Sequence, residues 1–246
     1  MDKNLFEWIV YLIKQYWPYF VDGTVLTLQT SVIGTLLGFL LGFLIGTVQS
    51  TPINKNDTIL QKSFLHIIKG ICVVFVEIFR GTPMMVQAMV VYYGLLSTGL
   101  EISPFYAAVL VILLNTGAYM AETVRAGINS IDNGQTEGAV ALGMTHFQTM
   151  FSVVLPQAFQ NIIPEMGNLF ITNLKMTSVL NVIGISELYF VTKTAANTYY
   201  KYFEAYLITG MIYFVLCFIF TRLFAFAEKK LEGKNHYELA KEYMEE

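Results

Sequence analysis

Long apolar stretches separated by short polar ones run along almost the whole chain. The apolar stretches cover residues 25–48, 67–96, 103–125, 151–182 and 202–226. A hydrocarbon core of roughly 30 Å needs about 20 apolar residues in a helix, so each stretch is long enough to cross it. Gly81, Thr82 and Pro83 break the second stretch, and Pro156 and Pro164 interrupt the fourth. With each broken stretch counted once, the pattern predicts an all-α integral membrane protein with five transmembrane helices.

Glycines recur at every fourth position in the first predicted span, at Gly34, Gly38, Gly42 and Gly46. Small residues at this spacing let a second helix approach closely, which favours packing between helices in lipid. The alternative is a glycine stripe that faces the lipid.

The two ends of the chain differ from the spans in pattern. Residues 1–22 mix charged and large apolar side chains, which indicates an amphipathic interfacial helix and not a cleavable secretory signal. Residues 228–246 are rich in charge and predict a solvated cytoplasmic tail. The expected organisation is therefore this N-terminal helix, a membrane domain over residues 23–227, and the tail.

Composition places the chain in the membrane class before any motif is considered. It is 55% apolar, 15% aromatic and 13% charged, with a mean hydropathy of +0.54, which is far from an ordinary soluble domain. The net charge of −3 comes with no basic run, so no nucleic-acid partner is expected. Cys72 and Cys217 lie in apolar stretches, so no disulfide is expected. The three histidines do not have the spacing of metal ligands, so no metal site is expected either.

Lysine and arginine distribution predicts the orientation. Five spans place the termini on opposite sides, and the cytoplasmic side carries the excess of positive charge. With the N-terminus outside, the inner side holds Lys55, Lys62, Lys69, Arg125, Arg222, Lys229, Lys230, Lys234 and Lys241. The outer side then holds Lys3, Lys14, Lys193 and Lys201. The C-terminus and the polar region at 132–156 are thus predicted to be cytoplasmic.

The region 132–156 has the pattern of a helix, a glycine turn and a second helix. Asp132 with Gln135 and Thr145 with Gln148 have the spacing of an N-cap and its partner, and Gly143 sits where the first helix would end. The small residues in the first helix leave it slim enough to enter a groove. We therefore expect a partner-binding surface, and the residues assigned to it are Gln135, Glu137, Ala139, Leu142 and Gly143.

Charged and amide side chains inside the second span form the first candidate for a substrate site. An ionised group at the bilayer centre costs about 3 kcal/mol on insertion scales, so Glu77 and Arg80 each suggest a function. Pro83 cannot donate a backbone hydrogen bond, which frees the carbonyl of Phe79 beside Arg80. A broken helix of this kind can hold a zwitterion, with Gln87 on the same face. The alternative is a structural ion pair between Glu77 and Arg80, three residues apart.

The third and fourth spans add further polar candidates. Glu122 and Arg125 form a second pair near the inner surface, either as a snorkelling ion pair or as part of a site or gate. The fourth span contributes Asn161, Glu165, Thr177 and Ser178. Their alternative role is to join helices by hydrogen bonds.

Three sequence blocks stand out along the chain: Glu-Ile-Phe-Arg-Gly-Thr-Pro at 77–83, Gly-Gln-Thr-Glu at 134–137 and Leu-Pro-Gln-Ala at 155–158. Together they resemble motifs of the permease subunits of ABC importers for polar amino acids, of the histidine/glutamine/arginine type. In the family's coupling-loop pattern, Glu137, Ala139, Gly143, Leu155 and Pro156 fit, whereas Gly138 and Val153 depart mildly. The connection at 49–66 is longer than the family's usual turn.

The resemblance implies a five-span subunit with a cytoplasmic coupling helix in a bacterial plasma membrane. It implies partnership with separate ATPase subunits that bind ATP and Mg²⁺, a second permease subunit in a homodimer or heterodimer, and an external solute-binding protein. The chain has no GxxxxGK[ST] loop, HExxH or GxSxG motif, so we expect a transporter subunit that is not itself an enzyme and carries no cofactor. An ATPase-independent carrier or channel is the rival, although the inverted repeats typical of secondary carriers are not evident.

Overall fold

The computed structural model describes residues 4–53 and 58–231, and its regular elements are all helical. The α-helices are α1 (Leu5–Ser50), α2 (Ile59–Gly81), α3 (Met84–Ser97), α4 (Pro104–Asn129), α5 (Asn133–Ala141), α6 (His146–Thr149), α7 (Leu155–Met176), α8 (Leu188–Tyr199) and α9 (Tyr202–Leu231). A π-helix, η1 (Met150–Val154), joins α6 to α7, and a 3₁₀-helix, η2 (Thr177–Ile183), follows α7.

The number of spans agrees with the sequence pattern. In the part of the chain that the structure describes, four helices (α1, α2, α4 and α9) are long and apolar enough to cross a membrane. The segment His146–Ile183 and α8, bent by 58°, make a fifth if they count as one broken span. The predicted break in the second stretch is also confirmed, because α2 ends at Gly81 and α3 begins at Met84.

Helix α1 is longer than predicted, since it continues through residue 22 without a break and contains Pro18. The expected division between a separate N-terminal helix and the first span is therefore wrong as a helix boundary; an interfacial position for this segment stays a prediction. The fully buried Leu12 and the nearly buried Phe20 anchor this half of α1 in a cluster with Leu188 of α8 and Ile208 of α9.

Four further features of the helices differ from the sequence prediction. Helix α2 begins at Ile59, well before residue 67, because Thr58 and Gln61 form a capping box there. Helix α7 passes through Pro164 without ending. Helix α8 was not predicted; its start is capped by Glu187, whose carboxylate accepts the backbone N–H groups of Tyr189 and Phe190 at 2.8 Å each. Helix α9 extends to Leu231, and the rest of the predicted tail lies outside the described residues.

The glycine ladder of α1 is the main contact between α1 and α4. A Cβ atom added at Gly38 would lie 2.6 Å from the Cβ of Thr116, and one added at Gly46 would lie 2.6 Å from the carbonyl oxygen of Ala121. Neither position has room for a side chain, so the predicted close packing is confirmed and the lipid-facing alternative is wrong. One buried amide strengthens this core: Asn173 of α7 donates to the hydroxyls of Thr35 and Thr116 at 2.8 Å each.

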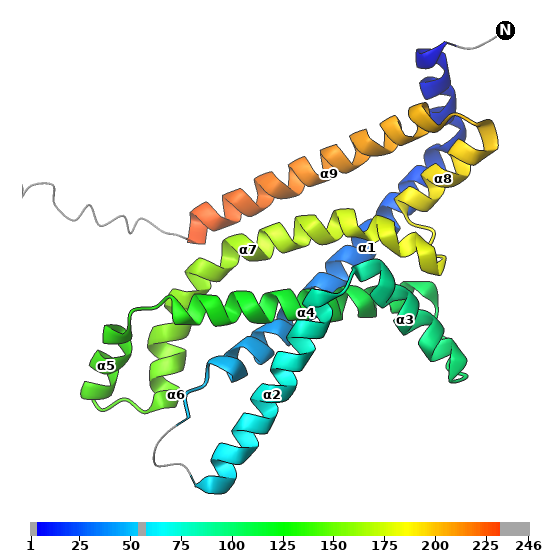
Figure 1. Cartoon of the computed structure of the whole chain (residues 1–246). Helices are drawn as coiled ribbons and strands as arrows, with labels where there is room; N and C mark the ends of the chain where they lie inside the picture. Colours follow the sequence, from blue (N-terminus) through cyan, green and yellow to red (C-terminus); the bar gives the residue numbers. More distant parts are fainter. Residues whose placement is uncertain (1–3, 54–57, 232–246) are drawn as a thin grey trace, which may run out of the picture.

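The helices give the molecule two distinct ends (Figure 1). Helices α5 and α6 project at one end, where α9 also finishes. The start of α1 and the whole of α8 lie at the other end. This arrangement puts the polar region 132–156 far from the N-terminus, as the predicted orientation requires.

Candidate functional site

A hollow of about 350 Å³ between the end of α1 and the facing sides of α2 and α4 gathers charged side chains. It is lined by Gln49, Lys69, Val73, Val76, Glu77, Arg80, Glu122 and Arg125. Three of the lining residues are cations and two are carboxylates. A hollow with both signs of charge inside a largely apolar bundle is suited to a zwitterion.

Glu122 is the central group of this hollow. Its carboxylate lies 3.6 Å from the Arg80 guanidinium across the α2–α4 contact, and it also pairs with Arg125 on its own helix. Arg80 is held further by the ring of Tyr119, whose centroid is 5.5 Å away. The predicted Glu122–Arg125 pair is therefore confirmed. The alternative pairing of Arg80 with Glu77 is wrong, because Arg80 reaches across to α4, where a closer carboxylate is available.

The break between α2 and α3 is organised by Gln87. Its amide nitrogen donates to the carbonyls of Phe79 and Thr82 at 2.9 Å each, and its oxygen accepts from Asn115 at 3.0 Å. Asn115 also donates to the Phe79 carbonyl at 3.2 Å. The carbonyl freed by Pro83 is thus used by side chains of the protein itself. Gln87 is buried and does not line the hollow. The structure therefore does not place it with the other predicted substrate-binding residues of this hollow.

Unused hydrogen-bonding capacity remains in the hollow. Glu77 has no ion-pair partner among the described residues, and the buried side-chain oxygen of Gln49 has no hydrogen-bond partner. Lys69, in contrast, donates to the carbonyl of Thr51 at 2.6 Å. A buried acceptor without a partner is costly, which favours a site that a ligand or water completes.

The remaining predicted site residues lie outside this hollow. Asn161 donates to the hydroxyl of Ser130 at 2.9 Å, which joins α7 to the end of α4. Glu165 accepts weakly from Asn168 at 3.5 Å. The hydroxyls of Thr177 and Ser178 donate to carbonyls of the preceding turn, at 2.9 Å and 2.7 Å. For Asn161 the geometry matches the alternative role of joining helices.

Sequence reasoning named Glu77 with Arg80 as one candidate group and Glu122 with Arg125 as another, and it missed two of their neighbours. Lys69 was counted only as an inner-side charge, and Gln49 as the start of a polar loop. A helical signal for Lys69 was present: it lies eight residues before Glu77, about two turns along the same face.

The polar region 132–156 folds as a compact helix, turn and helix. Asp132 caps α5 by accepting from the N–H of Gly134 at 2.6 Å, although Gln135 does not return the contact. The end of α5 is a Schellman motif: Met144 N–H bonds the Ala139 carbonyl at 3.1 Å, and Gly143 N–H bonds Val140 at 2.9 Å. Gly143 has φ +82°, which confirms its predicted role as the turn residue.

The second part of this region also follows the prediction and then departs from regular helix. Thr145 and Gln148 form the full predicted capping box at the start of α6. The π-turn η1 comes next, at the junction with α7. Such turns are rare and frequently mark functional segments, and this one joins the projecting region directly to a span.

The outer surface of this region is apolar at its tip. Leu142 is 85% exposed and Phe147 is 70% exposed, beside the exposed Gln135 and Glu137. Ala139 differs, because it is buried against the rest of the chain and does not face a partner. Large apolar side chains exposed on a polar projection are typical of a protein–protein contact.

Comparison with known proteins agrees with these features. Residues 38–233 match the family described as binding-protein-dependent transport system inner membrane components. The chain belongs to this family.

Curated relatives of this permease are transport permeases. It is 42% identical over 162 residues to the arginine transport system permease protein ArtQ of Bacillus subtilis, covering 65% of this chain and 74% of that protein. It is 33% identical over 224 residues to the putative glutamine transport system permease protein GlnP of Rickettsia typhi, covering 90% and 97%.

A solved structure agrees over nearly the whole permease. The crystal structure of an amino acid ABC transporter with histidines aligns with a TM-score of 0.80 at 34% identity. The alignment covers 94% of this chain and 100% of that one.

Proposed function

We propose that this permease is the membrane-spanning subunit of an ATP-driven importer for polar amino acids. The observation that carries the proposal is the pairing of two features at one end of the bundle: a projecting apolar-tipped helix pair, and a hollow that holds both signs of charge. The named relatives, an arginine and a putative glutamine transport system permease, favour amino acids as the class of solute.

Each feature has a distinct task in the proposed mechanism. The exposed face of α5 and the tip at Leu142 and Phe147 dock on a separate ATPase chain, which binds ATP and Mg²⁺. The charged hollow lies on the solute path, where Arg80 and Arg125 face the ligand carboxylate and Glu77 its ammonium group. An external binding protein delivers the solute, and a second permease subunit, identical or related, completes the path.

A change at the tip tests the coupling part of this proposal. Leu142→Asp is expected to abolish solute-stimulated ATP hydrolysis in the reconstituted complex, because a carboxylate replaces an apolar side chain that is 85% exposed and makes few contacts within its own subunit. The control is Leu100→Asp, since Leu100 is also exposed, at 61%, and lies between α3 and α4. Normal stimulation in a well-folded Leu142→Asp protein would contradict the docking role.

Thiol labelling of intact cells tests the orientation. A cysteine at Asn133, at the start of α5, is expected to be protected from an impermeant reagent added outside. A cysteine at Asn197, exposed on α8, is expected to react. Labelling after cell lysis supplies the control for accessibility. Reaction of the Asn133 cysteine in intact cells would place the projecting helices outside and remove the basis for ATPase docking.

A carrier that works without an ATPase is the second candidate. Such a carrier would need no ATPase chain docked at the tip, so Leu142→Asp would leave uptake unchanged. Uptake and solute-stimulated ATP hydrolysis, both measured for Leu142→Asp, therefore separate the two candidates.

A further inference from the structure

A second hollow, of about 420 Å³, lies where the projecting helices α5 and α6 join the rest of the molecule (Figure 1). Its lining comes from the ends of α1 and α4, from α5 and α6, and from η1. None of the lining residues belongs to the charged hollow between α1, α2 and α4. We call it the junction hollow, and it is lined by Ser50, Pro52, Ile128, Asn129, Ile131, Asn133, Thr136, His146, Thr149, Met150 and Val154.

Helix ends dictated by the sequence meet around the junction hollow. Thr51 is extended, with φ −63° and ψ 123°, because the residue before a proline disfavours helix geometry, and α1 therefore ends ahead of Pro52. Helix α4 ends at Asn129, just before the turn into α5. The wide turn of η1 precedes Pro156, whose ring would clash with the carbonyl four residues earlier in a regular α-helix. Backbone that turns away at three places leaves the space between them open.

The most deeply buried lining residues are largely apolar. Ile128 of α4 and Val154 of η1 are 7% and 5% exposed and belong to one buried cluster, against which Ile131 and Met150 pack. These residues form the floor of the junction hollow, and their packing against two spans keeps them in place. An apolar floor that includes a methionine thioether suits the face of an aromatic ring, since contacts between sulfur and such rings are favourable.

Thr149 puts a polar group into this floor. Its side chain is only 2% exposed, and its hydroxyl has no hydrogen-bond partner in the described part of the chain. A buried hydroxyl without a partner is costly, and a threonine in a helix has two accessible rotamers through which it can turn toward a ligand. Among the described residues the other such oxygen is that of Gln49, which lines the charged hollow. Both unpartnered oxygens therefore belong to hollows, which favours a site that a ligand completes.

The rim of the junction hollow is polar but uncharged, since no lining residue is an aspartate, glutamate, lysine or arginine. Asn129, Asn133 and Thr136 make no side-chain hydrogen bond within the described residues, so their donors and acceptors are open to a ligand. The nearby Asp132 uses its carboxylate to cap α5. An ionised ligand would lose water here without gaining an ion pair, whereas an amide edge finds both donors and acceptors in the two asparagines.

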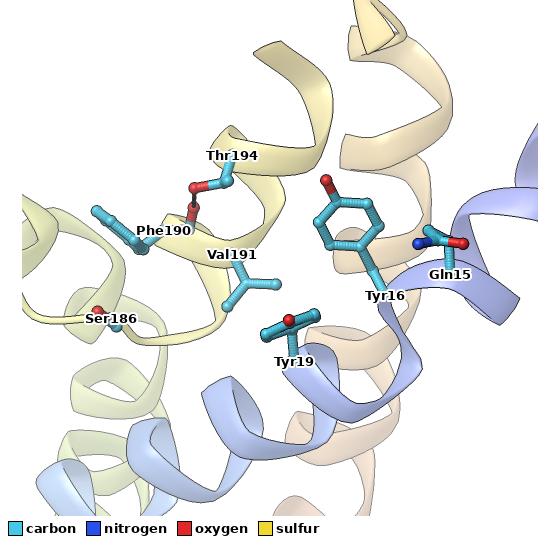
Figure 2. A pocket seen from close by; sticks show the side chains of 7 residues that line it. All are labelled: Gln15, Tyr16, Tyr19, Ser186, Phe190, Val191 and Thr194. Atoms are coloured by element: carbon cyan, nitrogen blue, oxygen red, sulfur yellow. Dashed lines mark hydrogen bonds between the residues drawn. The ribbon is translucent and has the colours of Figure 1, made fainter. Parts of the chain in front are cut away.

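The larger hollow at the opposite end of the molecule lacks these features. Figure 2 shows the Phe190 ring and the Thr194 hydroxyl turned away from the two tyrosines of α1, and this hydroxyl donates to the Phe190 carbonyl at 3.0 Å. Neither of the buried unpartnered oxygens of the described residues lines it. That hollow encloses about 480 Å³ between α1 and α8, and it is lined by Gln15, Tyr16, Tyr19, Ser186, Phe190, Val191 and Thr194.

We infer that the junction hollow is a binding site for a small uncharged ring compound with an amide edge, the chemistry of nicotinamide and of the nucleobases. The ring lies on Met150 and the apolar floor, the amide edge pairs with Asn129 and Asn133, and the Thr149 hydroxyl gains a partner. The volume is adequate, because small-molecule sites typically enclose about 300–1,000 Å³. The inference goes beyond the proposed transport function and uses none of its residues.

The test titrates the permease, labelled with [methyl-¹³C]methionine and assembled with unlabelled ATPase subunits in nanodiscs. Nicotinamide is the probe, and nicotinate is the comparison, because it keeps the ring and replaces the amide by a carboxylate. The titrations are run at pH 8, at which free histidine is neutral. Nicotinamide is expected to shift the Met150 methyl resonance, identified by its loss in Met150→Leu, in a saturable way. Nicotinate is expected to need at least about tenfold higher concentration.

Matched variants separate recognition from packing. Thr149→Val keeps the shape of the side chain and is expected to raise the nicotinamide midpoint by about threefold to tenfold. Its melting temperature should not fall, because the lost hydroxyl has no partner within the described chain. Asn129→Ala should raise the midpoint by a similar factor. Asn168→Ala is the control, since Asn168 is exposed on α7 and does not line the junction hollow, and it should retain the wild-type midpoint.

Three results would overturn the site: equal midpoints for nicotinamide and nicotinate, a shift that does not saturate, or an unchanged midpoint in both Thr149→Val and Asn129→Ala. A junction hollow that holds only water gives the second of these. Arg80→Gln alters the charged hollow and should leave the midpoint unchanged. If nicotinamide binds but the complex takes up no amino acid, the proposed function fails and the site stands. If uptake proceeds without a saturable shift, only the site fails.

Discussion

Replacing Gly42 by alanine is expected to destabilise the folded permease more than alanine at any exposed glycine. A Cβ atom at Gly42 would lie 2.5 Å from the Cβ of Met120 and 2.7 Å from the carbonyl oxygen of Gly117. Backbone cannot move aside cheaply, so α1 and α4 must separate, at a cost of about 1–3 kcal/mol in the free energy of unfolding. Gly42→Leu should prevent folding altogether.

The measurement is the melting temperature of detergent-solubilised permease, followed by size-exclusion chromatography after heating. Gly70→Ala supplies the control, because nothing lies within 4 Å of a Cβ atom at Gly70 in α2. That change removes a glycine from a helix interior and should be neutral or stabilising by up to about 1 kcal/mol. Similar melting temperatures for Gly42→Ala and Gly70→Ala would show that α1 and α4 are not in close contact.

The second large effect is expected at Glu122. Glu122→Gln removes the carboxylate that Arg80 and Arg125 share, which leaves two guanidinium groups facing each other in one hollow. The stability loss should stay near 1 kcal/mol, because both arginine side chains are more than 40% exposed and solvent screens them. Uptake should fall by about tenfold or more, since a ligand carboxylate would bind between arginines that are no longer held in place.

Two further variants test whether the effect of Glu122→Gln on uptake depends on the position of the Glu122 carboxylate or only on the loss of a negative charge in the hollow. Glu77→Gln should change stability little, because Glu77 has no ion-pair partner among the described residues. The exchange Arg80→Glu with Glu122→Arg restores the cross-helix attraction but puts the charges in each other's places. It should recover only part of the stability, because the arginine at position 122 repels Arg125, and it should not recover uptake. Full uptake in the exchanged protein would reduce Arg80 and Glu122 to a structural pair.

Much of the architecture was predictable because it depends on local spacing. The length of the apolar stretches gave the spans, the fourfold spacing of glycines gave the α1–α4 contact, and Thr145 with Gln148 gave the start of α6. Each of these signals acts over one or two helical turns. The missed helix α8 is different: its capping residue Glu187 is an acid buried among neighbouring helices, and no local spacing in the sequence indicates such surroundings.

The candidate site was harder to predict because its contacts join distant segments. The spacing of Glu77 and Arg80 allowed a pair within one helix, the alternative to a ligand site, yet the guanidinium binds Glu122 of α4. Gln87 had the position of a ligand-binding residue, and the structure uses it to satisfy carbonyls that the Pro83 break leaves free. Local rules identify which side chains are polar within a span, whereas the packing of α2 on α4 decides which of them meet.

The interlocked glycines of α1 also limit how this permease can move. Because α1 and α4 fit backbone to backbone along four successive turns, they cannot slide or rotate against each other and must travel as a rigid pair. Helix α2 meets α4 in part through the ion pair between Arg80 and Glu122, whose side chains are partly solvated. A change between inward-open and outward-open shapes would therefore concentrate at the α2–α4 seam. The charged hollow lies in that seam, so its volume would change with each cycle.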